Sequence, residues 1–244
     1  MPTSARPEAI DYGWPYAGLA LAAVLLAVLF LRRSPVGQPY AARFRDPAWL
    51  VWAAVPMYML HQFEEHGVDL LGRRYHFQQT MCATLGYQDL VACPCDPAFI
   101  LAVNVPLAWI AGPFYGSLAR RFPYLGAAIL CTPVINALAH IVPALLRAEY
   151  NPGLLTAVVL FVPYCAYALR ELRRQGVLDR PRLASIPLLG LAQHAVLLAS
   201  LKAVEADRIG PTVRDLIQVA NPFLPLVAAA ALNRLLRGRV SARG

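Results

Sequence analysis

Six long stretches of the chain carry no Asp, Glu, Lys or Arg, and this spacing of charge constrains the fold more than any other feature. They are residues 15–31, 97–119, 122–146, 150–169, 183–201 and 216–233. Each is close to the roughly 20 residues that a helix needs to cross ~30 Å of hydrocarbon. Residues 47–66, apolar up to a polar end, add one more. The sequence therefore predicts an all-α, polytopic transmembrane helical bundle of about seven spans.

Composition and the chain ends agree with a membrane protein of one domain. Only 15% of residues are charged, against about a quarter in soluble domains. The first apolar segment does not resemble a cleaved signal, because Arg residues follow it and no small-residue cleavage site is evident. With no internal repeat and no Gly/Ser-rich linker, residues 1–244 are interpreted as a single integral membrane domain.

Basic residues predict the orientation. Fifteen of the 22 Lys and Arg residues lie in alternate loops, those that face inward if the N-terminus is outside. Cytoplasmic loops are enriched in Lys and Arg, so we expect the N-terminus out and the C-terminus in. The net charge of +8 then reflects topology. A nucleic-acid partner is not expected, because the Arg residues flank spans and form no single patch.

Polar residues on three predicted spans fall at one depth. His61 lies 16 residues beyond Arg45, roughly 24 Å along a helix. Asn104 on the next span and His140 on the following one reach a similar outer level by the same measure. Ionisable groups at such depth normally face the interior of a bundle and find partners there.

Spacing suggests that these residues form a metal site. His61, Glu64 and Glu65 stand at i, i+3 and i+4 and share a helix face, whereas His66 points away and is a weaker member. Imidazole with carboxylate suits Zn, Fe or Mn. We expect four metal ligands: His61, Glu64, Glu65 and His140. The amides of Asn104 and Asn136 are expected to lie behind these ligands and to support them.

A structural interpretation remains open beside the metal site. The end of the second span could simply meet water, with Glu64 paired to Arg73 or Arg74. Asn136 and His140 could form an interhelical hydrogen bond. His194, on the sixth span, could be a ligand, a proton relay or a packing residue.

The motif residues resemble those of a known family. His61-x-x-Glu64-Glu65, followed by Asn136-x-x-x-His140 and then Tyr150-Asn-Pro-Gly, is similar to the HXXEE family of bacterial membrane proteins of unknown function, over about residues 50–170. The resemblance marks these positions: His61, Glu64, Glu65, Asn136, His140, Tyr150, Pro152 and Gly153. It implies a bacterial inner membrane and names no reaction. The Asn-Pro-Gly turn either reverses the chain or helps to open an anion site at the next helix.

Three functions fit this pattern. The favoured one is a membrane metalloenzyme, hydrolytic with Zn or oxidative with iron, acting on a lipid or isoprenoid-like substrate, with Glu64, Glu65 and Tyr150 as catalytic residues. The second is a metal-free isomerase or cyclase in which Glu64 and Glu65 titrate apart as acid and base. The third is a proton-coupled carrier using Glu65 and His194, although no inverted repeat supports it.

Cysteines in the predicted outer loop suggest a disulfide. Cys82 is expected to pair with Cys93 or Cys95, because this loop would face an oxidising space. A zinc site that uses these thiols with His76 is the alternative. Cys131 and Cys165 lie inside spans and are expected to behave as small apolar residues.

Overall fold

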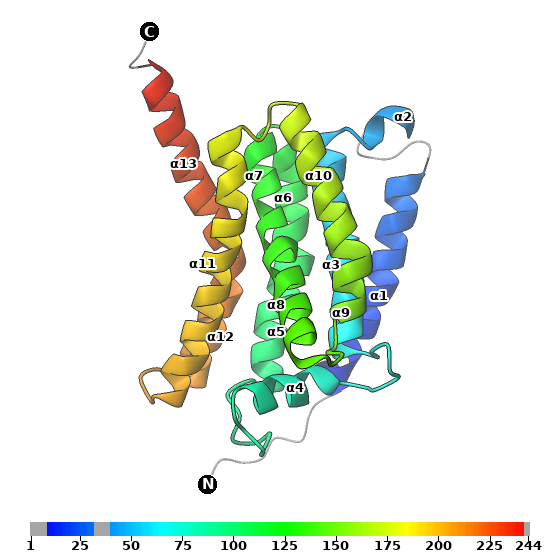
Figure 1. Cartoon of the computed structure of the whole chain (residues 1–244), viewed down its shortest axis with the longest axis vertical. Helices are drawn as coiled ribbons and strands as arrows, with labels where there is room; N and C mark the ends of the chain where they lie inside the picture. Colours follow the sequence, from blue (N-terminus) through cyan, green and yellow to red (C-terminus); the bar gives the residue numbers. More distant parts are fainter. Residues whose placement is uncertain (1–8, 32–39, 242–244) are drawn as a thin grey trace.

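The computed structural model describes residues 9–31 and 40–241, and the fold is a helical bundle with no β-strand in those ranges. Long helices run nearly parallel to one another, joined by short loops (Figure 1). The elements are α1 (Ala9–Phe30), α2 (Tyr40–Arg43), α3 (Pro47–His66), α4 (His76–Thr84), α5 (Pro97–Val105), η1 (Pro106–Ala111), α6 (Gly112–Ala119), α7 (Pro123–Ala127), η2 (Ala128–Leu130), α8 (Cys131–Arg147), α9 (Leu154–Thr156), η3 (Ala157–Phe161), α10 (Val162–Arg174), α11 (Arg180–Glu205), α12 (Pro211–Ala220), η4 (Asn221–Phe223) and α13 (Leu224–Ser241).

Six helical segments among the described residues are long and apolar enough to cross a membrane. They are Tyr12–Phe30, Pro97–Ala119, Pro123–Arg147, Leu154–Arg174, Arg180–Glu205 and Pro211–Leu236. Together they confirm the predicted polytopic bundle. α3 runs along the same axis through the bundle. It is not among the six, because its polar end makes it less apolar than they are. α1 begins at one end of the bundle and α13 ends at the other (Figure 1).

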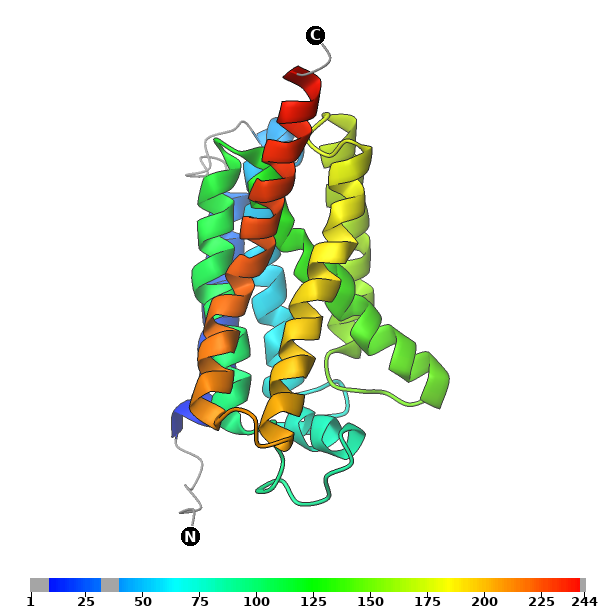
Figure 2. The same ribbon diagram turned by 90° about the vertical axis from the view of Figure 1, so that its left-hand side faces the viewer.

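α3 occupies the interior of the bundle. It lies among α1, α6, α7 and the short helices η1 and η3, and Figure 2 shows it, in cyan, in the middle of the bundle. Its first turn is capped by Asp46, whose side chain accepts a hydrogen bond from the amide of Ala48 at 2.9 Å. The indole of Trp49 donates to the carbonyl of Leu29 at 3.0 Å and ties α3 to α1. The helix that carries the polar motif is therefore the most enclosed one.

Prolines interrupt the spans at defined points. Pro56, Pro143 and Pro187 lie inside α3, α8 and α11. Pro106 begins η1, a π-helical turn within the Pro97–Ala119 segment, and Pro163 follows the second π-helical turn, η3. Proline lacks an amide hydrogen, and a span that contains it needs such a local adjustment to re-pair the backbone.

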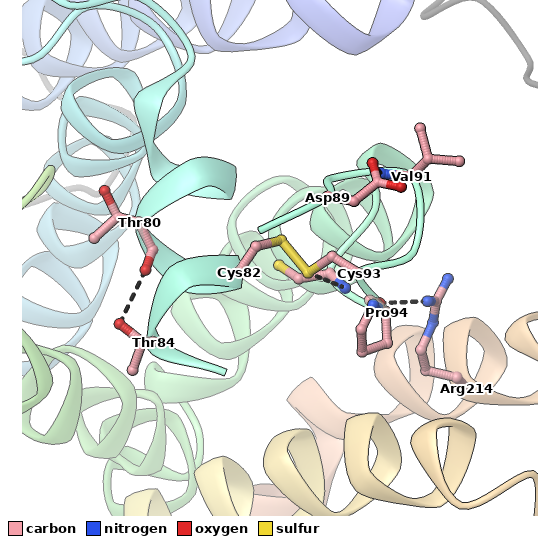
Figure 3. The surroundings of a disulfide bond; sticks show 9 residues. Thr80, Cys82, Thr84, Asp89, Val91, Cys93, Pro94 and Arg214 are labelled. Carbon is pink, nitrogen blue, oxygen red and sulfur yellow. Dashed lines mark hydrogen bonds between the residues drawn. A yellow bond between two sulfur atoms is a disulfide. The ribbon is translucent and has the colours of Figure 1, made fainter. Parts of the chain in front are cut away.

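A disulfide ties α4 to the loop that follows it, at the end of the bundle where the polar motif lies. Cys82 on α4 pairs with Cys93 (Figure 3), which confirms one of the two predicted partners. The neighbouring backbone is tied to α12, because Arg214 donates to the carbonyl of Pro94 and to both oxygens of Asp96, the latter at 3.0 Å. Phe77 and Met81 of α4 reach the main cavity. The disulfide thus holds α4 over that cavity.

Candidate metal centre

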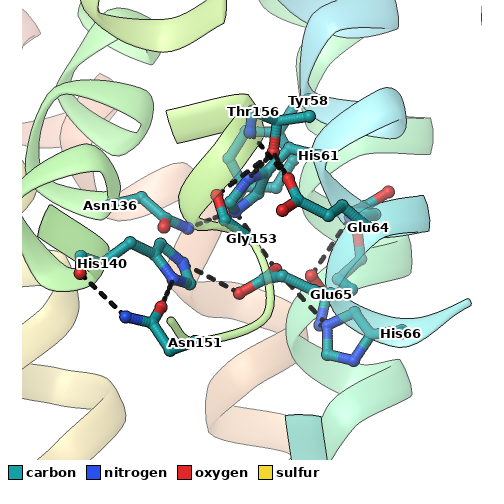
Figure 4. Close-up of polar contacts among 12 residues, drawn as sticks. Tyr58, His61, Glu64, Glu65, His66, Asn136, His140, Asn151, Gly153 and Thr156 are labelled. Carbon is teal, nitrogen blue, oxygen red and sulfur yellow. Dashed lines mark hydrogen bonds and ion pairs between the residues drawn. The ribbon is translucent and has the colours of Figure 1, made fainter. Parts of the chain in front are cut away.

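Two histidines and one glutamate from α3 and α8 converge in the interior (Figure 4). Glu65 Oε2 lies 3.2 Å from His61 Nε2, and Glu65 Oε1 lies 3.0 Å from His140 Nε2. All three side chains are buried, and their ligand atoms lie within 4.8 Å of one another. Tetrahedral ligands at ~2.1 Å from a zinc ion stand roughly 3.4 Å apart. The spacing is therefore compatible with a single ion, and we call these residues the trio: His61, Glu65 and His140.

The far nitrogen of each imidazole is hydrogen-bonded. His61 Nδ1 lies 2.7 Å from Thr156 Oγ1, and the Thr156 hydroxyl itself donates to Glu64. His140 Nδ1 lies 2.7 Å from the Asn151 amide oxygen, whose amide nitrogen donates to the His140 carbonyl at 3.0 Å. In both cases the partner oxygen can only accept from the ring, so the neutral imidazole carries its hydrogen on Nδ1.

Both Nε2 atoms therefore present lone pairs toward the Glu65 carboxylate. A lone pair does not stabilise a carboxylate, so the arrangement requires a cation or a proton among the three groups. His61 Nε2, fully buried, has no hydrogen-bond partner, and its 3.2 Å approach to Glu65 lacks hydrogen-bond geometry. Imidazoles that bind metals are oriented in this way, with the far nitrogen donating to a neighbouring oxygen.

Gly153 packs directly against the trio. A Cβ atom at this position would lie 2.7 Å from His140 Cε1, 2.8 Å from Glu65 Cγ and 2.8 Å from His61 Cε1. Its φ of +92° is one that residues with a side chain rarely adopt. The Tyr-Asn-Pro-Gly turn thus supplies both the acceptor for His140, at Asn151, and a glycine that leaves room for the three side chains.

Glu64 lies outside the trio, contrary to the prediction that it is a ligand. Its carboxylate accepts hydrogen bonds from the backbone amides of Leu155, at 3.0 Å, and Thr156, at 2.7 Å. The Tyr150 hydroxyl donates to it at 2.7 Å. A carboxylate at the first amides of a helix is a stabilising cap. Glu64 and Tyr150 therefore hold the start of α9 against α3.

The alternative pairing of Glu64 with an arginine does not form, because Arg73 pairs with Asp69 at 2.7 Å. Burial and the hydrogen bond to Glu64 raise the pKa of Tyr150. Tyr150 also accepts a hydrogen bond from the amide of Leu70 at 3.0 Å. Its hydroxyl is thus engaged on both sides at neutral pH.

The two predicted supporting amides lie near the trio but contact other groups. Asn104 accepts from Gln62 and is 3.2 Å from His66 Nε2, which in turn lies 3.5 Å from Glu65. Asn136 donates to the Tyr58 hydroxyl at 2.9 Å. His66, which the spacing treated as a weaker member, reaches Glu65 directly. The oxygens that contact the imidazoles of the trio belong to Thr156 and Asn151. The sequence pattern predicts a supporting role for neither residue.

A cavity of about 220 Å³ opens beside the trio. Glu65 and His140 line it, together with apolar side chains from α4, α5 and α11 such as Phe77, Ile100 and Leu197. A neighbouring cavity of about 160 Å³ shares His140 and extends toward Arg147. His194 lines the main cavity, with Nδ1 2.8 Å from the Gly190 carbonyl. The geometry offers a small molecule access to two members of the trio.

The described residues contain no other group of three clustered His, Cys, Asp or Glu side chains with metal-ligand spacing. The alternative of a zinc site built from the loop thiols and His76 is therefore not supported, since Cys82 and Cys93 are joined to each other.

Comparison with known proteins identifies one similarity. Residues 52–168 match the family described as "HXXEE: Protein of unknown function with HXXEE motif". Neither the curated proteins nor the solved structures contain a match to the chain. The trio, Glu64, Tyr150 and Gly153 all lie inside the matched segment.

Proposed function

The chain belongs to the HXXEE family across residues 52–168, and we propose that it is an integral membrane enzyme that binds one divalent metal ion at the trio. The substrate would be a hydrophobic molecule held in the adjacent cavity. The observation that carries the proposal is the orientation of the two imidazoles. Both are fixed through Nδ1, and both direct Nε2 at one buried carboxylate.

Two histidines and one carboxylate form a three-ligand set that leaves a coordination position for a substrate or water. Zn²⁺ is the ion that we favour, with Fe²⁺ as the other ion that takes this ligand set. The ion would supply Lewis-acid activation of a carbonyl group or of water. Glu65 would hold the ion and face the cavity, and His66, 3.5 Å from Glu65, could carry a proton to or from it.

The route for a hydrophobic substrate is supported by the shape of α8. Its C-terminal end leans away from the bundle (Figure 2), and Leu145 and Leu146 there are 77% and 81% exposed. His140 lies earlier on the same helix and lines both cavities. A lipid-like molecule could thus approach His140 from the bilayer without crossing the polar loops.

Elemental analysis of the purified protein tests the metal. We expect about one Zn or Fe per chain, lost in His61→Ala and in His140→Ala and kept in the control His194→Ala, whose side chain bonds to Gly190 rather than to the trio. Folded protein that takes up no metal after reconstitution with Zn²⁺, Fe²⁺ or Mn²⁺ would refute the centre. Retention of metal in both alanine variants would also refute it.

A metal-free acid–base enzyme is the second candidate, since a proton could take the place of the ion. Glu65 lies within 3.5 Å of three imidazoles, those of His61, His66 and His140. In such an enzyme the acid–base pair would be Glu65 and a histidine. Glu64 would not take part, because its carboxylate accepts hydrogen bonds from the start of α9. A carrier that uses Glu65 and His194 is less well supported, since no contact joins those two described residues.

A further inference from the structure

The inner part of the main cavity is lined by uncharged hydrogen-bonding side chains that the proposed metal centre does not use. On α8, Asn136 stands one turn and Thr132 two turns from His140, on the side away from the loops. Other helices contribute the remaining members of this group. The group, which we call the amide end, consists of Thr132, Asn136, Gln193, His194, Gln218 and Asn221.

Within the amide end two buried side-chain acceptors are free. Thr132 donates to the Gln193 side chain at 2.7 Å, and Asn221 donates to the Gln193 carbonyl at 3.0 Å. The amide of Asn136 donates to Tyr58. The side-chain oxygens of Asn136 and Asn221 are nevertheless buried without a hydrogen-bond partner, and Asn221 is only 7% exposed. A buried acceptor left unpaired costs ~1–3 kcal/mol.

His194 adds an acceptor to the same region. Its Nδ1 lies against the Gly190 carbonyl, which can only accept, so the neutral ring bears its hydrogen on Nδ1. Nε2 then carries a lone pair. The amide end therefore presents acceptors at Asn136, Asn221 and His194, and a ligand that brings a hydrogen-bond donor of its own can satisfy them.

The charge of the cavity limits the ligand further. Among the described residues that line it there is no Lys or Arg, and Glu65 is the one carboxylate. A phosphate or carboxylate headgroup at the amide end would be buried one to two helix turns from the ion proposed at the trio and without a Lys or Arg partner, which is costly. The remaining walls are apolar. The cavity is thus suited to an uncharged molecule with a long apolar part and a polar hydrogen.

We propose that the cavity binds a neutral lipid alcohol, whose hydroxyl donates to Asn136 or Asn221 while its apolar chain lies against Ile100, Val103 and Leu197. The inference that this alcohol is the substrate rests on the proposed function. The inference that the cavity binds the alcohol does not depend on it. A hydroxyl at the amide end lies about one to two helix turns, roughly 5–10 Å, from the trio. A bond of the alcohol that reacts at the trio would therefore lie roughly 5–10 Å from the hydroxyl group.

Photo-crosslinking in nanodiscs tests the proposal. The probes are a long-chain alcohol, the fatty acid of equal length and the alkyl phosphate of equal length, each with a diazirine in the chain. We expect the alcohol to label cavity-lining peptides at least fivefold more than either anion. Asn136→Leu and Asn221→Leu should each lower that labelling about fivefold, as loss of one hydrogen bond predicts. Asn233→Leu is the control, because Asn233 pairs with Arg182 away from the cavity.

A second variant guards against misfolding, since Asn221→Leu also removes bonds to Gln193 and Gln218. Ala139 is exposed yet lines the cavity, so Ala139→Trp should fill the cavity in a folded protein and abolish labelling by the alcohol. Equal labelling by all three probes would overturn the proposal. So would preferred labelling by the alkyl phosphate that depends on Arg147 in the neighbouring cavity.

The same assay on protein stripped of metal separates the two proposals. Preference for the alcohol in a protein that binds no metal would support the alcohol site while refuting the metal centre. Stoichiometric metal without any preference for the alcohol would refute the alcohol site and leave the metal centre in place.

Discussion

Glu64 Oε2 accepts a hydrogen bond from the backbone amide of Thr156 at 2.7 Å, and through it the polar motif on α3 is joined to the first turn of α9. The next residue, Glu65, faces the two imidazoles instead. Two consecutive glutamates thus have separate tasks, one in holding a helix and one in the candidate centre.

Replacing each glutamate by its amide should separate these tasks. Glu65→Gln should abolish metal binding, because the amide is a poor substitute for the only carboxylate of the trio. Glu64→Gln should keep the metal and lower the stability of the protein by ~1–3 kcal/mol, since charge-assisted bonds to α9 are weakened. Metal content and thermal unfolding in detergent measure both effects. Equal loss of metal in the two variants would contradict this division.

Gly153→Ala should remove the metal by steric intrusion. The added methyl group would stand within 3 Å of atoms in all three trio side chains. Gly86→Ala is the matched control, because Gly86 has a φ of +90° and nothing within 4 Å of the position of its Cβ. Both variants pay the backbone strain of ~1–2 kcal/mol, but only Gly153→Ala should lose metal. Metal retained in Gly153→Ala would show that the glycine serves the turn alone.

The oxygens behind the imidazoles should control metal affinity. Thr156→Val and Asn151→Leu each remove the partner of an Nδ1 atom, and losses of this kind typically cost 10–100-fold in affinity. Asn104→Ala should have a smaller effect, because Asn104 contacts His66 and Gln62 rather than a trio member. Competition with a chelator of known affinity gives the constants. An effect of Asn104→Ala as large as the others would favour the support that we first predicted from the sequence.

Tyr150 should make stability depend on pH at the alkaline end. Its folded-state pKa is raised, so its contribution is complete below the unfolded value of ~10 and is lost as pH rises further. The stability advantage of the protein over Tyr150→Phe should therefore fall by ~1.4 kcal/mol per pH unit above pH ~10. Denaturant titrations of both proteins at pH 8 and pH 11 measure the difference. An advantage that grows over this interval would contradict the assignment.

Thiol labelling should report the state of the loop that joins Cys82 to Cys93. Native protein at pH 8 should not react at Cys95, whose pKa is raised to about 12 by burial. After unfolding without reductant three of the five cysteines should react, and after reduction all five. Cys93→Ser should lower stability by ~2–4 kcal/mol, whereas Cys165→Ser, which breaks no disulfide, should not. Five reactive thiols without reductant would show that Cys82 and Cys93 are not joined.

Much of this arrangement follows from the sequence, for physical reasons that differ between residues. Uncharged runs of roughly 20 residues locate the spans. Counting along the helices from Arg45 and from Arg121 places His61 and His140 at a similar depth. Periodicity does not decide between Glu64 and Glu65, because adjacent residues on a helix point about 100° apart and either can face a neighbour. Only the packed structure shows which one does.

Thr156 and Asn151 illustrate the harder case. Asn151 lies in the turn after α8, between left-handed residues at Ala148 and Gly153, and Thr156 ends the short helix α9 that follows this turn. No repeat predicts where side chains in such a turn, or in a helix of three residues, point. The quoted Tyr-Asn-Pro-Gly sequence already contained Asn151. An amide in an Asn-Pro-Gly turn, directly after a histidine-bearing helix, is the available signal.

The enclosure of α3 has a consequence for how the protein is made. Since α3 is less apolar than its neighbours and ends in His61, Glu64, Glu65 and His66, it gains little from contact with lipid alone. The partners of His61, Glu64 and Glu65 on α8 and α9 are synthesised 75 to 95 residues later, counted from Glu65 to His140 and from His61 to Thr156. Until they emerge from the ribosome, α3 is held by apolar neighbours such as α1 and α6, and a nascent chain that stops before residue 131 is expected to leave this helix partly outside the bilayer.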